Sequence, residues 1–142
     1  MTQIDFYFHV EDKLRTACTL SAKAYARGLR VLAYCTDRDA GQKFSRTLWT
    51  APAISFVPHC TADDKLAAVT PVIIDHDGTT LAHDDVLLNL RNELPSFFSR
   101  FQRLIEIVSI DEEDRRQARD RFKFYRDRGY EIRSHDLSKR SQ

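Results

Sequence analysis

Apolar runs alternate with segments of helical periodicity along the first third of the chain. The run "IDFYFHV", residues 4–10, is aromatic and β-branched, and residues 12–28 place apolar side chains near one helical face before Gly28. The run "LRVLAYC", residues 29–35, is typical of a strand buried on both faces of a parallel sheet, and residues 37–49 again have a helical pattern. The pattern therefore predicts two strand and helix pairs in succession.

The second half of the chain continues this alternation. The apolar runs "PVIID" and "VLLNL" predict two strands, separated by the polar stretch "HDGTTLAHDD" at residues 76–85. A helix around "PSFFSRF" and a strand "LIEIVS" are expected next. One further helix is expected after these elements, and the last strand pattern, "YEIRSHDL", follows that helix.

That further helix has clear end signals and is predicted to span residues 111–128. Ser109 and Glu112 fit a capping box, and four successive acids from Asp111 to Asp114 suit the positive end of the helix dipole. Gly129 supplies the stop signal. On this prediction, two side chains of the helix, Ala118 and Tyr125, face the sheet.

The alternation predicts a single three-layer α/β/α domain over residues 1–137, followed by a polar tail at 138–142. Its sheet is expected to be mostly parallel and nucleotide-binding-like, with the hairpin-like middle strands and the last strand as antiparallel exceptions. The four glycines do not cluster and acids follow the first strand, so the phosphate loop of a nucleotide enzyme is missing. The fold is predicted to be a scaffold.

Charge and cysteine content restrict the function further. The chain carries 22 Lys and Arg against 21 Asp and Glu, so no field over the whole surface favours nucleic acid or anionic lipid. Three cysteines without C-x-x-C spacing, Cys18, Cys35 and Cys60, indicate buried free thiols in a reducing compartment. With no leader-like start and no run of membrane-spanning length, a cytoplasmic protein is expected.

The stretch "VIIDHDGTTL" matches the first motif of haloacid-dehalogenase-type phosphatases. In that alternative, Asp75 is the nucleophile, Asp77 is the general acid and base, and both hold magnesium. Such enzymes also need a later Ser or Thr, a Lys and a further acidic pair, and no adjacent acidic pair follows Lys123, so a solvated turn is the favoured interpretation. His76 and His83 lie among acids of the same loop without the spacing of a ligand set, so exposed histidines are favoured over a metal site.

The predicted last helix is the basic part of the chain. From Arg115 to Arg128 it carries seven bases against two acids, and Arg115, Arg119, Phe122 and Arg126 fall on one stripe with Lys123 at its edge. A solvated basic face, with Phe122 dipping into the core, explains the charge as well as a binding site does. If the helix is a site, one phenylalanine within a basic stripe fits a short acidic peptide better than nucleic acid, which needs several stacking aromatics.

Three stretches together resemble the chi subunit family of bacterial DNA polymerase III. They are "LWTAPAISFVPH", "LLNL" and "RDRFKFYRDRGYEI", in a chain whose first strand pattern contains "FYF" at residues 6–8. The resemblance implies a non-enzymatic adaptor that needs no cofactor. Its implied partners are the psi subunit of the clamp loader and the acidic, Pro-Phe-ending C-terminal tail of single-stranded-DNA-binding protein. Related proteins also engage a DNA-repair helicase, and neither a membrane nor sequence-specific nucleic acid is an expected partner.

The resemblance also implies two sets of site residues. Bases would meet the carboxylates of the tail, while its phenylalanine enters a pocket lined by Val108 and Phe122. The implied tail-binding residues are Arg115, Arg119, Phe122, Lys123, Val108 and Trp49. The implied psi-binding residues are Phe56, Val57, Pro58 and His59, in a segment whose prolines would keep it stiff.

Overall fold

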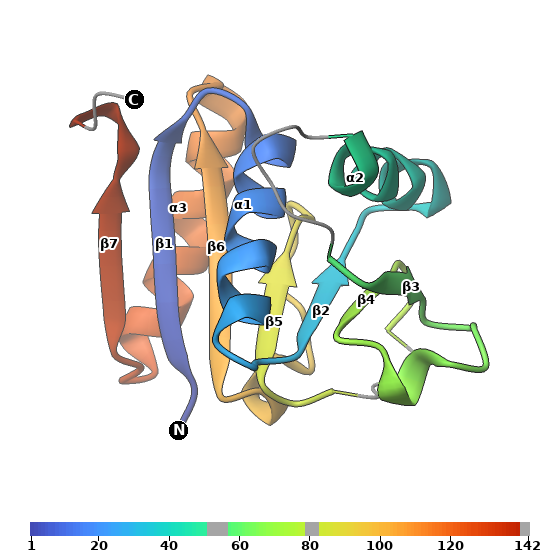
Figure 1. The fold of residues 1–142 in the computed structure, drawn as a ribbon. Helices are drawn as coiled ribbons and strands as arrows, with labels where there is room; N and C mark the ends of the chain where they lie inside the picture. The colour runs from blue at the N-terminus through green and yellow to red at the C-terminus, as the bar shows by residue number, and fades with distance from the viewer. Residues whose placement is uncertain (51–56, 79–82, 140–142) are drawn as a thin grey trace.

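The strands of the protein form one sheet, which runs through the whole molecule (Figure 1). The computed structural model describes residues 1–50, 57–78 and 83–139. Within them the sheet order is β3-β4-β2-β5-β6-β1-β7. The strands are β1 (Gln3–Val10), β2 (Val31–Tyr34), β3 (His59–Thr61), β4 (Val72–Asp75), β5 (Val86–Asn89), β6 (Arg103–Ser109) and β7 (Ile132–Asp136). The helices are α1 (Lys13–Ala26), α2 (Arg38–Thr50) and α3 (Glu112–Asp127).

Every strand pair in the described residues is parallel, so the predicted antiparallel exceptions are wrong. The middle strands β4 and β5 do not pair with each other, because β2 lies between them and places Val31 opposite both Val72 and Val86. The last strand, β7, pairs with β1 in parallel. Helix α3 makes this possible, because it returns the chain to the end of the sheet at which the strands begin. The carboxyl ends of all the described strands therefore lie at the same end of the sheet.

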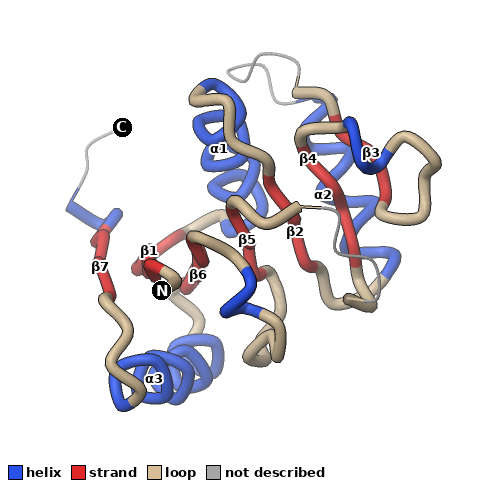
Figure 2. Tube along the Cα trace, turned by 90° about the horizontal axis from the view of Figure 1, so that it is seen from below, coloured by secondary structure: helices blue, strands red, loops and turns tan. Residues whose placement is uncertain are grey.

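The helices cover both faces of the sheet, which confirms the predicted three-layer α/β/α class. Helices α1 and α2 pack on one face, over a core that includes Cys18, Phe44 and Leu48. Helix α3 packs on the other face, over a core that includes Phe6 and Phe98 (Figure 2). A parallel sheet needs this cover because its strands are apolar on both sides.

Several predicted details differ in the structure. The region around "PSFFSRF" forms only a short 3₁₀ helix, Phe98–Arg100, and β3 follows the proline-containing stretch where no strand was predicted. Cys18 and Cys35 are buried, and burial raises the pKa of both thiols to about 12, whereas Cys60 is only half-buried. Among the described helices, none has the length and apolar character needed to cross a bilayer.

The two ends of α3 differ in how well they match the start and stop signals predicted from the sequence. Asp111, not Ser109, is the N-cap, and its carboxylate accepts the N–H of Asp114. Ser109 instead accepts the N–H of Asp111. Gly129 lies directly after the helix with φ of 83°, a left-handed conformation that costs glycine least, so the predicted stop is confirmed.

A β-bulge interrupts the pairing of β1 with β6 near their carboxyl ends. Tyr7 lies opposite Ile107 and Val10 opposite Ser109, so two residues of β1 face one residue of β6 between these points. The two bulged residues are Phe8 and His9, and the residue opposite is Val108. This break in the ladder occurs at the carboxyl ends of the two strands, where the chain leaves β6 and enters α3.

Candidate functional site

A small hollow lies at the bulge, between the carboxyl ends of β1 and β6 and the first turns of α3. Its volume is about 190 Å³, and we call it the Val108 hollow. The lining residues are Phe8, His9, Val108, Ser109, Arg115 and Arg119. Pockets that hold whole small-molecule ligands measure roughly 300–1,000 Å³. The hollow therefore suits one side chain and an adjoining charged group better than it suits a nucleotide.

The floor of the hollow is apolar and is supported by stacked aromatic rings. The ring of Phe8 stacks on Phe6 with 5.6 Å between centroids, and Phe6 contacts Phe122 at 5.2 Å. Val108 is almost fully buried. Phe122 is partly buried and packs against the core without lining the hollow, while Phe8 takes the lining position that the resemblance implied for Phe122.

The rim of the hollow is basic. Arg115 and Arg119 line it from successive turns of α3, and both are exposed. Arg115 also makes an ion pair with Glu112, with 3.5 Å between nitrogen and oxygen, at a strongly solvated position where such a pair adds little stability. Lys123 is exposed one turn after Arg119. An anion at the rim would meet two guanidinium groups, which can each bind a carboxylate through a pair of hydrogen bonds.

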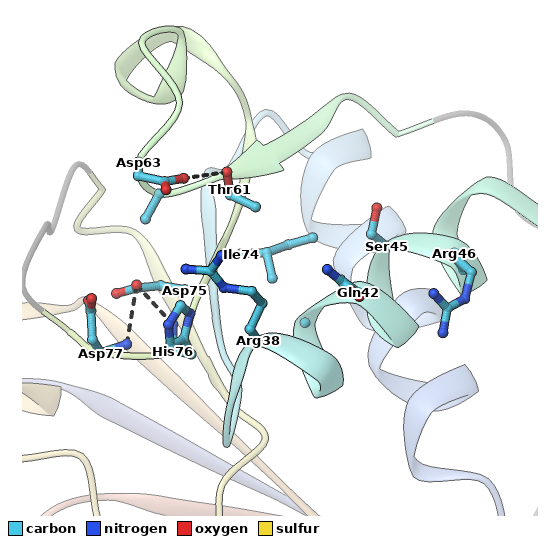
Figure 3. Close-up of a pocket in the computed structure, with 12 residues that line it drawn as sticks. Arg38, Gln42, Ser45, Arg46, Thr61, Asp63, Ile74, Asp75, His76 and Asp77 are labelled. Carbon is cyan, nitrogen blue, oxygen red and sulfur yellow. Dashed lines mark hydrogen bonds between the residues drawn. The ribbon is translucent and has the colours of Figure 1, made fainter.

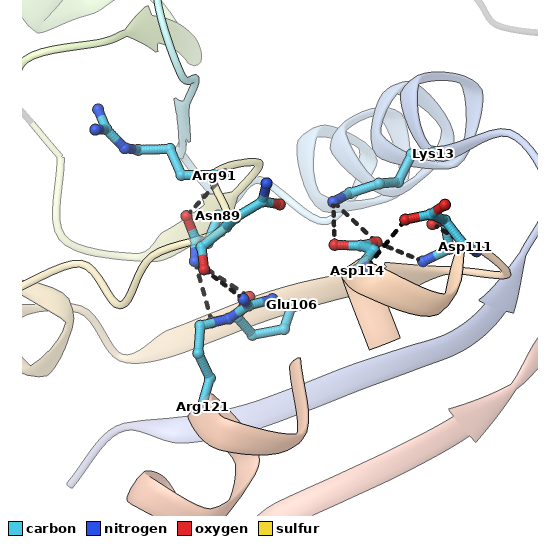
Figure 4. Close-up of polar contacts among 9 residues, drawn as sticks. Lys13, Asn89, Arg91, Glu106, Asp111, Asp114 and Arg121 are labelled. Atoms are coloured by element: carbon cyan, nitrogen blue, oxygen red, sulfur yellow. Dashed lines mark hydrogen bonds and ion pairs between the residues drawn. The ribbon is translucent and has the colours of Figure 1, made fainter. Parts of the chain in front are cut away.

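The start of α3, and with it the rim, is tied to the rest of the fold by Asp114 (Figure 4). Its carboxylate accepts the N–H of Ser109 at 2.9 Å and lies 3.4 Å from the ammonium of Lys13 on α1. Burial by itself would raise the pKa of Asp114, but the Ser109 N–H and the Lys13 charge outweigh it, so the pKa is lowered. The ionised carboxylate therefore holds α3 against the end of β6.

The inner side of α3 carries a buried polar cluster centred on Glu106 (Figure 4). The carboxylate of Glu106 accepts hydrogen bonds from Tyr125 Oη at 2.7 Å, Arg121 Nε at 3.2 Å and Asn89 Nδ2 at 3.1 Å. Arg121 also donates through Nη1 to the carbonyl of Asn92 at 2.7 Å. Arg121 was counted among the seven bases of the predicted basic helix, but it is 4% exposed and does not contribute to the basic outer face. Ala118 and Tyr125 are buried against the sheet, as predicted.

Arg128 lies away from the hollow and is engaged elsewhere on α3. Its guanidinium carbon is 3.8 Å from the centre of the Phe124 ring, which is a cation–π contact. Arg116 pairs with Glu113 and Asp120 on the solvent side of the helix. The bases of this segment therefore form several separate groups. Arg115 and Arg119 are the group that lines the hollow.

Trp49 does not lie with the other residues implied for tail binding. It belongs to α2, which packs on the opposite face of the sheet from α3. Its side chain is 64% exposed, and its ring meets the edge of the His59 ring with 5.6 Å between centroids. The resemblance placed Trp49 beside the residues implied for tail binding, and the structure corrects this. Trp49 lies on the other side of the sheet, because α2 and α3 cover opposite faces.

The segment implied for psi binding is partly buried. Val57 is 2% exposed and packs in the core below α1 and α2, while Pro58 is half-buried. His59 is held by Ser45 Oγ at 3.1 Å from Nε2 and by the Val57 carbonyl at 2.7 Å from Nδ1. Phe56 falls outside the described residues. The exposed surface next to this segment is the ring of Trp49 with the adjoining ring of His59.

A larger cavity of about 480 Å³ lies between α2 and the end of β4, where Asp75 and Asp77 line it (Figure 3). Asp75 is 3% exposed, and its carboxylate accepts the N–H groups of His76 at 2.8 Å and Gly78 at 2.9 Å. Burial raises the pKa of Asp75. Its oxygens thus cap the turn that follows β4. The turn agrees with the favoured interpretation, but Asp75 within it is buried and not solvated.

The histidines of this loop also have structural surroundings. His83 is buried, contrary to the prediction of an exposed loop histidine, and its Nε2 lies 2.7 Å from the carbonyl of Thr70. His76 is half-buried. Across residues 1–50, 57–78 and 83–139, no three His, Cys, Asp or Glu side chains are grouped as metal ligands.

Two residues of the Val108 hollow, Phe8 and His9, were missed by the sequence argument. Both lie in β1, far along the chain from α3, and were treated only as strand residues. A signal was available, because ligands in open α/β sheets bind at the carboxyl ends of the strands. The signal needed knowledge that β1 and β6 are neighbours, which the periodicity does not contain.

Comparison with known proteins gives one consistent result. A family profile described as DNA polymerase III chi subunit, HolC, matches residues 1–133. DNA polymerase III subunit chi of Pseudomonas aeruginosa is 34% identical over 141 residues, which cover 96% of this chain and 98% of that protein. The proteins of the same name from Haemophilus influenzae and Escherichia coli are each 30% identical, over 93% and 81% of this chain and 95% and 79% of their own lengths.

Proposed function

Because the chain belongs to the DNA polymerase III chi subunit family, we propose that it is an adaptor that links the clamp loader to single-stranded-DNA-binding protein. The family is an accessory, non-catalytic subunit of the replication machinery, and the resemblance predicted from the sequence is confirmed. The phosphatase alternative based on Asp75 and Asp77 is therefore wrong. We place the protein in the cytoplasm, with the replication machinery that it serves.

The observation that carries the proposal is the pairing of an apolar floor with a basic rim in the Val108 hollow. A peptide that ends in phenylalanine carries an aromatic ring and a terminal carboxylate on the same residue. The ring would enter the hollow against Phe8 and Val108, while Arg115 and Arg119 bind the carboxylate. Lys123, one turn further along α3, would attract the acidic residues that precede the ring.

Single-stranded nucleic acid is a poorer fit to the same surface. Such ligands bind to grooves in which several exposed aromatic rings stack on successive bases. Here Phe6 and Tyr125 are buried in the core, and the partly buried ring of Phe122 packs against Phe6. The proposed ligand is therefore a short acidic peptide and not a nucleic-acid strand.

Calorimetric titration with a synthetic acidic peptide ending in Pro-Phe tests this proposal. We expect binding that weakens as salt rises, because the rim charges are exposed. Removal of the terminal phenylalanine is expected to abolish most of the binding, and amidation of its carboxylate to weaken it strongly. An amidated peptide that binds as tightly as the free acid would show that the rim does not recognise the terminal carboxylate.

For the psi subunit we propose a second surface, on the opposite face of the sheet, formed by Trp49 and His59 together with the half-buried Pro58. An exposed tryptophan supported by a neighbouring ring has the character of an interface anchor, which often contributes about 2 kcal/mol or more to binding. Trp49→Ala is expected to weaken binding to a psi subunit without changing tail-peptide affinity. Loss of peptide binding in this variant would mean that the two surfaces are not separate.

The same tail surface is available to other acidic peptides. A DNA-repair helicase is a further proposed partner, and competition between it and the tail peptide would show whether the two share the Val108 hollow. Retention of helicase binding at saturating peptide would place the helicase elsewhere.

A further inference from the structure

His9 has a left-handed backbone conformation, which is uncommon for residues other than glycine. Its φ is +59°, and it is the only non-glycine residue with positive φ in the described part of the chain. This conformation is uncommon for side chains other than those of glycine, asparagine and aspartate, although histidine is also enriched there. Strained residues tend to occur at functional sites, and bulges often turn a side chain toward such a site.

The bulge turns His9 toward the place where a ligand is expected. His9 lines the Val108 hollow together with Phe8, its neighbour in the bulge, and Val108, the residue opposite. It also lines an adjoining hollow of about 680 Å³ bounded by the start of α1 and by Ile110. His9 is therefore the shared wall of two hollows, and its side chain is 41% exposed.

Asp136 determines the hydrogen-bonding state of the His9 ring. Its carboxylate Oδ1 lies 2.7 Å from Nδ1 of His9. Hydrogen bonds from His9 and Ser138 lower the pKa of Asp136 to about 2, so Asp136 is an ionised acceptor near neutral pH. Nδ1 must then carry a proton and donate it to this bond. In the neutral ring Nε2 has only a lone pair, so it donates a hydrogen bond only after the ring takes up a second proton.

The charges around His9 come from three elements. Asp136 belongs to β7, Glu11 and Asp12 follow β1 in the adjoining hollow, and Arg115 and Arg119 belong to α3. A peptide carboxylate bound to the two arginines would add a negative charge beside His9, and a nearby negative charge favours the protonated form of an imidazole ring.

From these observations we infer that His9 is a third ligand for the carboxylate of an acidic peptide in the Val108 hollow, and that its contact requires uptake of one proton. The inference rests on the proposed peptide-binding function. The proton comes from solvent and resides on Nε2, while Nδ1 keeps its bond to Asp136. Capture of the peptide is consequently linked to pH, with tighter binding as pH falls toward the range in which histidine is protonated.

The experiment is a titration of the full chain with the Pro-Phe-ending acidic peptide between pH 6 and pH 8. We expect affinity about five- to tenfold higher at pH 6 than at pH 8. Peptide carboxylates stay ionised throughout this range, so they do not contribute to the change. Repeating the titration at one pH in buffers of different ionisation enthalpy counts the protons taken up, and we expect a fraction of one proton per peptide.

Three variants separate ligand chemistry from backbone effects. His9→Asn keeps a side chain that tolerates positive φ but cannot be protonated, so it is expected to abolish proton uptake and the pH dependence while the protein stays folded. His9→Gly relieves the backbone strain and is expected to raise the melting temperature while also abolishing uptake. His76→Asn removes a histidine far from the hollow and is expected to retain both the uptake and the pH dependence.

The possible results decide between the hypotheses. Peptide binding with equal affinity at both pH values, or with the same proton uptake in wild type and His9→Asn, would overturn the role of His9 and leave the proposed function in place. Failure of the peptide to bind at any pH would overturn the proposed function and this inference together.

Discussion

The two sides of helix α3 use the same residue type for opposite purposes. Arg121 points inward, is 4% exposed and is bonded to Glu106 and to the carbonyl of Asn92. Arg119, two positions earlier in the chain, is exposed at the rim of the Val108 hollow. Sequence alone assigns both to one basic helix. Their surroundings assign Arg121 to the fold and Arg119 to a ligand.

The difference shows which charged groups remain available for binding. A buried charge is tolerated only when a partner and hydrogen bonds offset its desolvation, so its bonding capacity is largely used within the protein. A charge at the edge of a hollow keeps its capacity for a ligand, at little cost to stability. Variants of the two sides are therefore expected to differ in whether they lose stability or binding.

The largest expected effect is on the inner side. Arg121→Met leaves the Glu106 carboxylate buried without its ion-pair partner, and we expect a loss of about 3–5 kcal/mol in the free energy of unfolding. Denaturant unfolding measures this loss, and peptide titration of the remaining folded protein is expected to show nearly unchanged affinity. The double variant Glu106→Leu with Arg121→Met removes both charges and is expected to recover part of the stability. A double variant as unstable as Arg121→Met alone would mean that packing, not the unpaired charge, causes the loss.

On the outer side of α3, a substitution is expected to weaken peptide binding and to leave the stability of the fold almost unchanged. Arg119→Ala removes a charge-assisted hydrogen bond to the peptide, with an expected cost of about 1.5–3 kcal/mol in binding free energy. The free energy of unfolding is expected to change by no more than about 0.5 kcal/mol, as at ordinary surface positions. Calorimetric titration and denaturant unfolding of the same sample give both numbers. A stability loss as large as that of Arg121→Met would contradict the division.

Asp114 connects the two sides, because it holds the start of α3 and thereby the rim. Asp114→Asn is expected to cost about 1 kcal/mol of stability through loss of the Lys13 ion pair and of favourable charge at the helix start. The pKa of Asp114 is lowered from 3.8 in the folded state, so the unfolded chain binds the proton more tightly. Its contribution is therefore present above pH 3.8 and is lost as pH falls below that value. Acid unfolding of both proteins checks the sign, since the stability gap is expected to close at low pH.

The smallest effect is expected at Arg128, which serves as the matched control for Arg119. Both are exposed arginines of the same basic segment, but Arg128 stacks on Phe124 and does not line the hollow. Arg128→Ala is expected to leave peptide affinity close to that of the wild type, and to cost at most about 1 kcal/mol of stability from the lost cation–π contact. Equal affinity losses for the two variants in parallel titrations would indicate a diffuse basic face, without a specific hollow.

Much of the fold was predictable from local patterns. Periodicity located β1, α1, β2, α2, β4, β5, β6, α3 and β7. The direction of the middle strands was not predictable, because it depends on the insertion of β2 between β4 and β5. The short strand β3 was missed because its three residues, His59–Thr61, are too few for a pattern.

The candidate site divides in a similar way. Arg115, Arg119 and Val108 were named from the family resemblance, and the structure brings them together. Trp49 was placed with them because the stretch around it carries part of the same resemblance, but the sheet separates it from α3. A resemblance identifies residues without telling which of two faces each one occupies.

The sequence by itself determined the alternation of strands and helices, the stop of α3 at Gly129 and the family of the chain. These features depend on backbone geometry and on side chains within a few positions of each other, so they can be read along the chain. The tertiary structure alone decided the burial of Arg121 and the bulge that places His9 beside Val108. The bulge arises from the pairing of β1 with β6, which are distant along the chain and meet only when the sheet has formed. The burial of Arg121 arises when α3 packs on the sheet and brings Arg121 to Glu106 and to the carbonyl of Asn92.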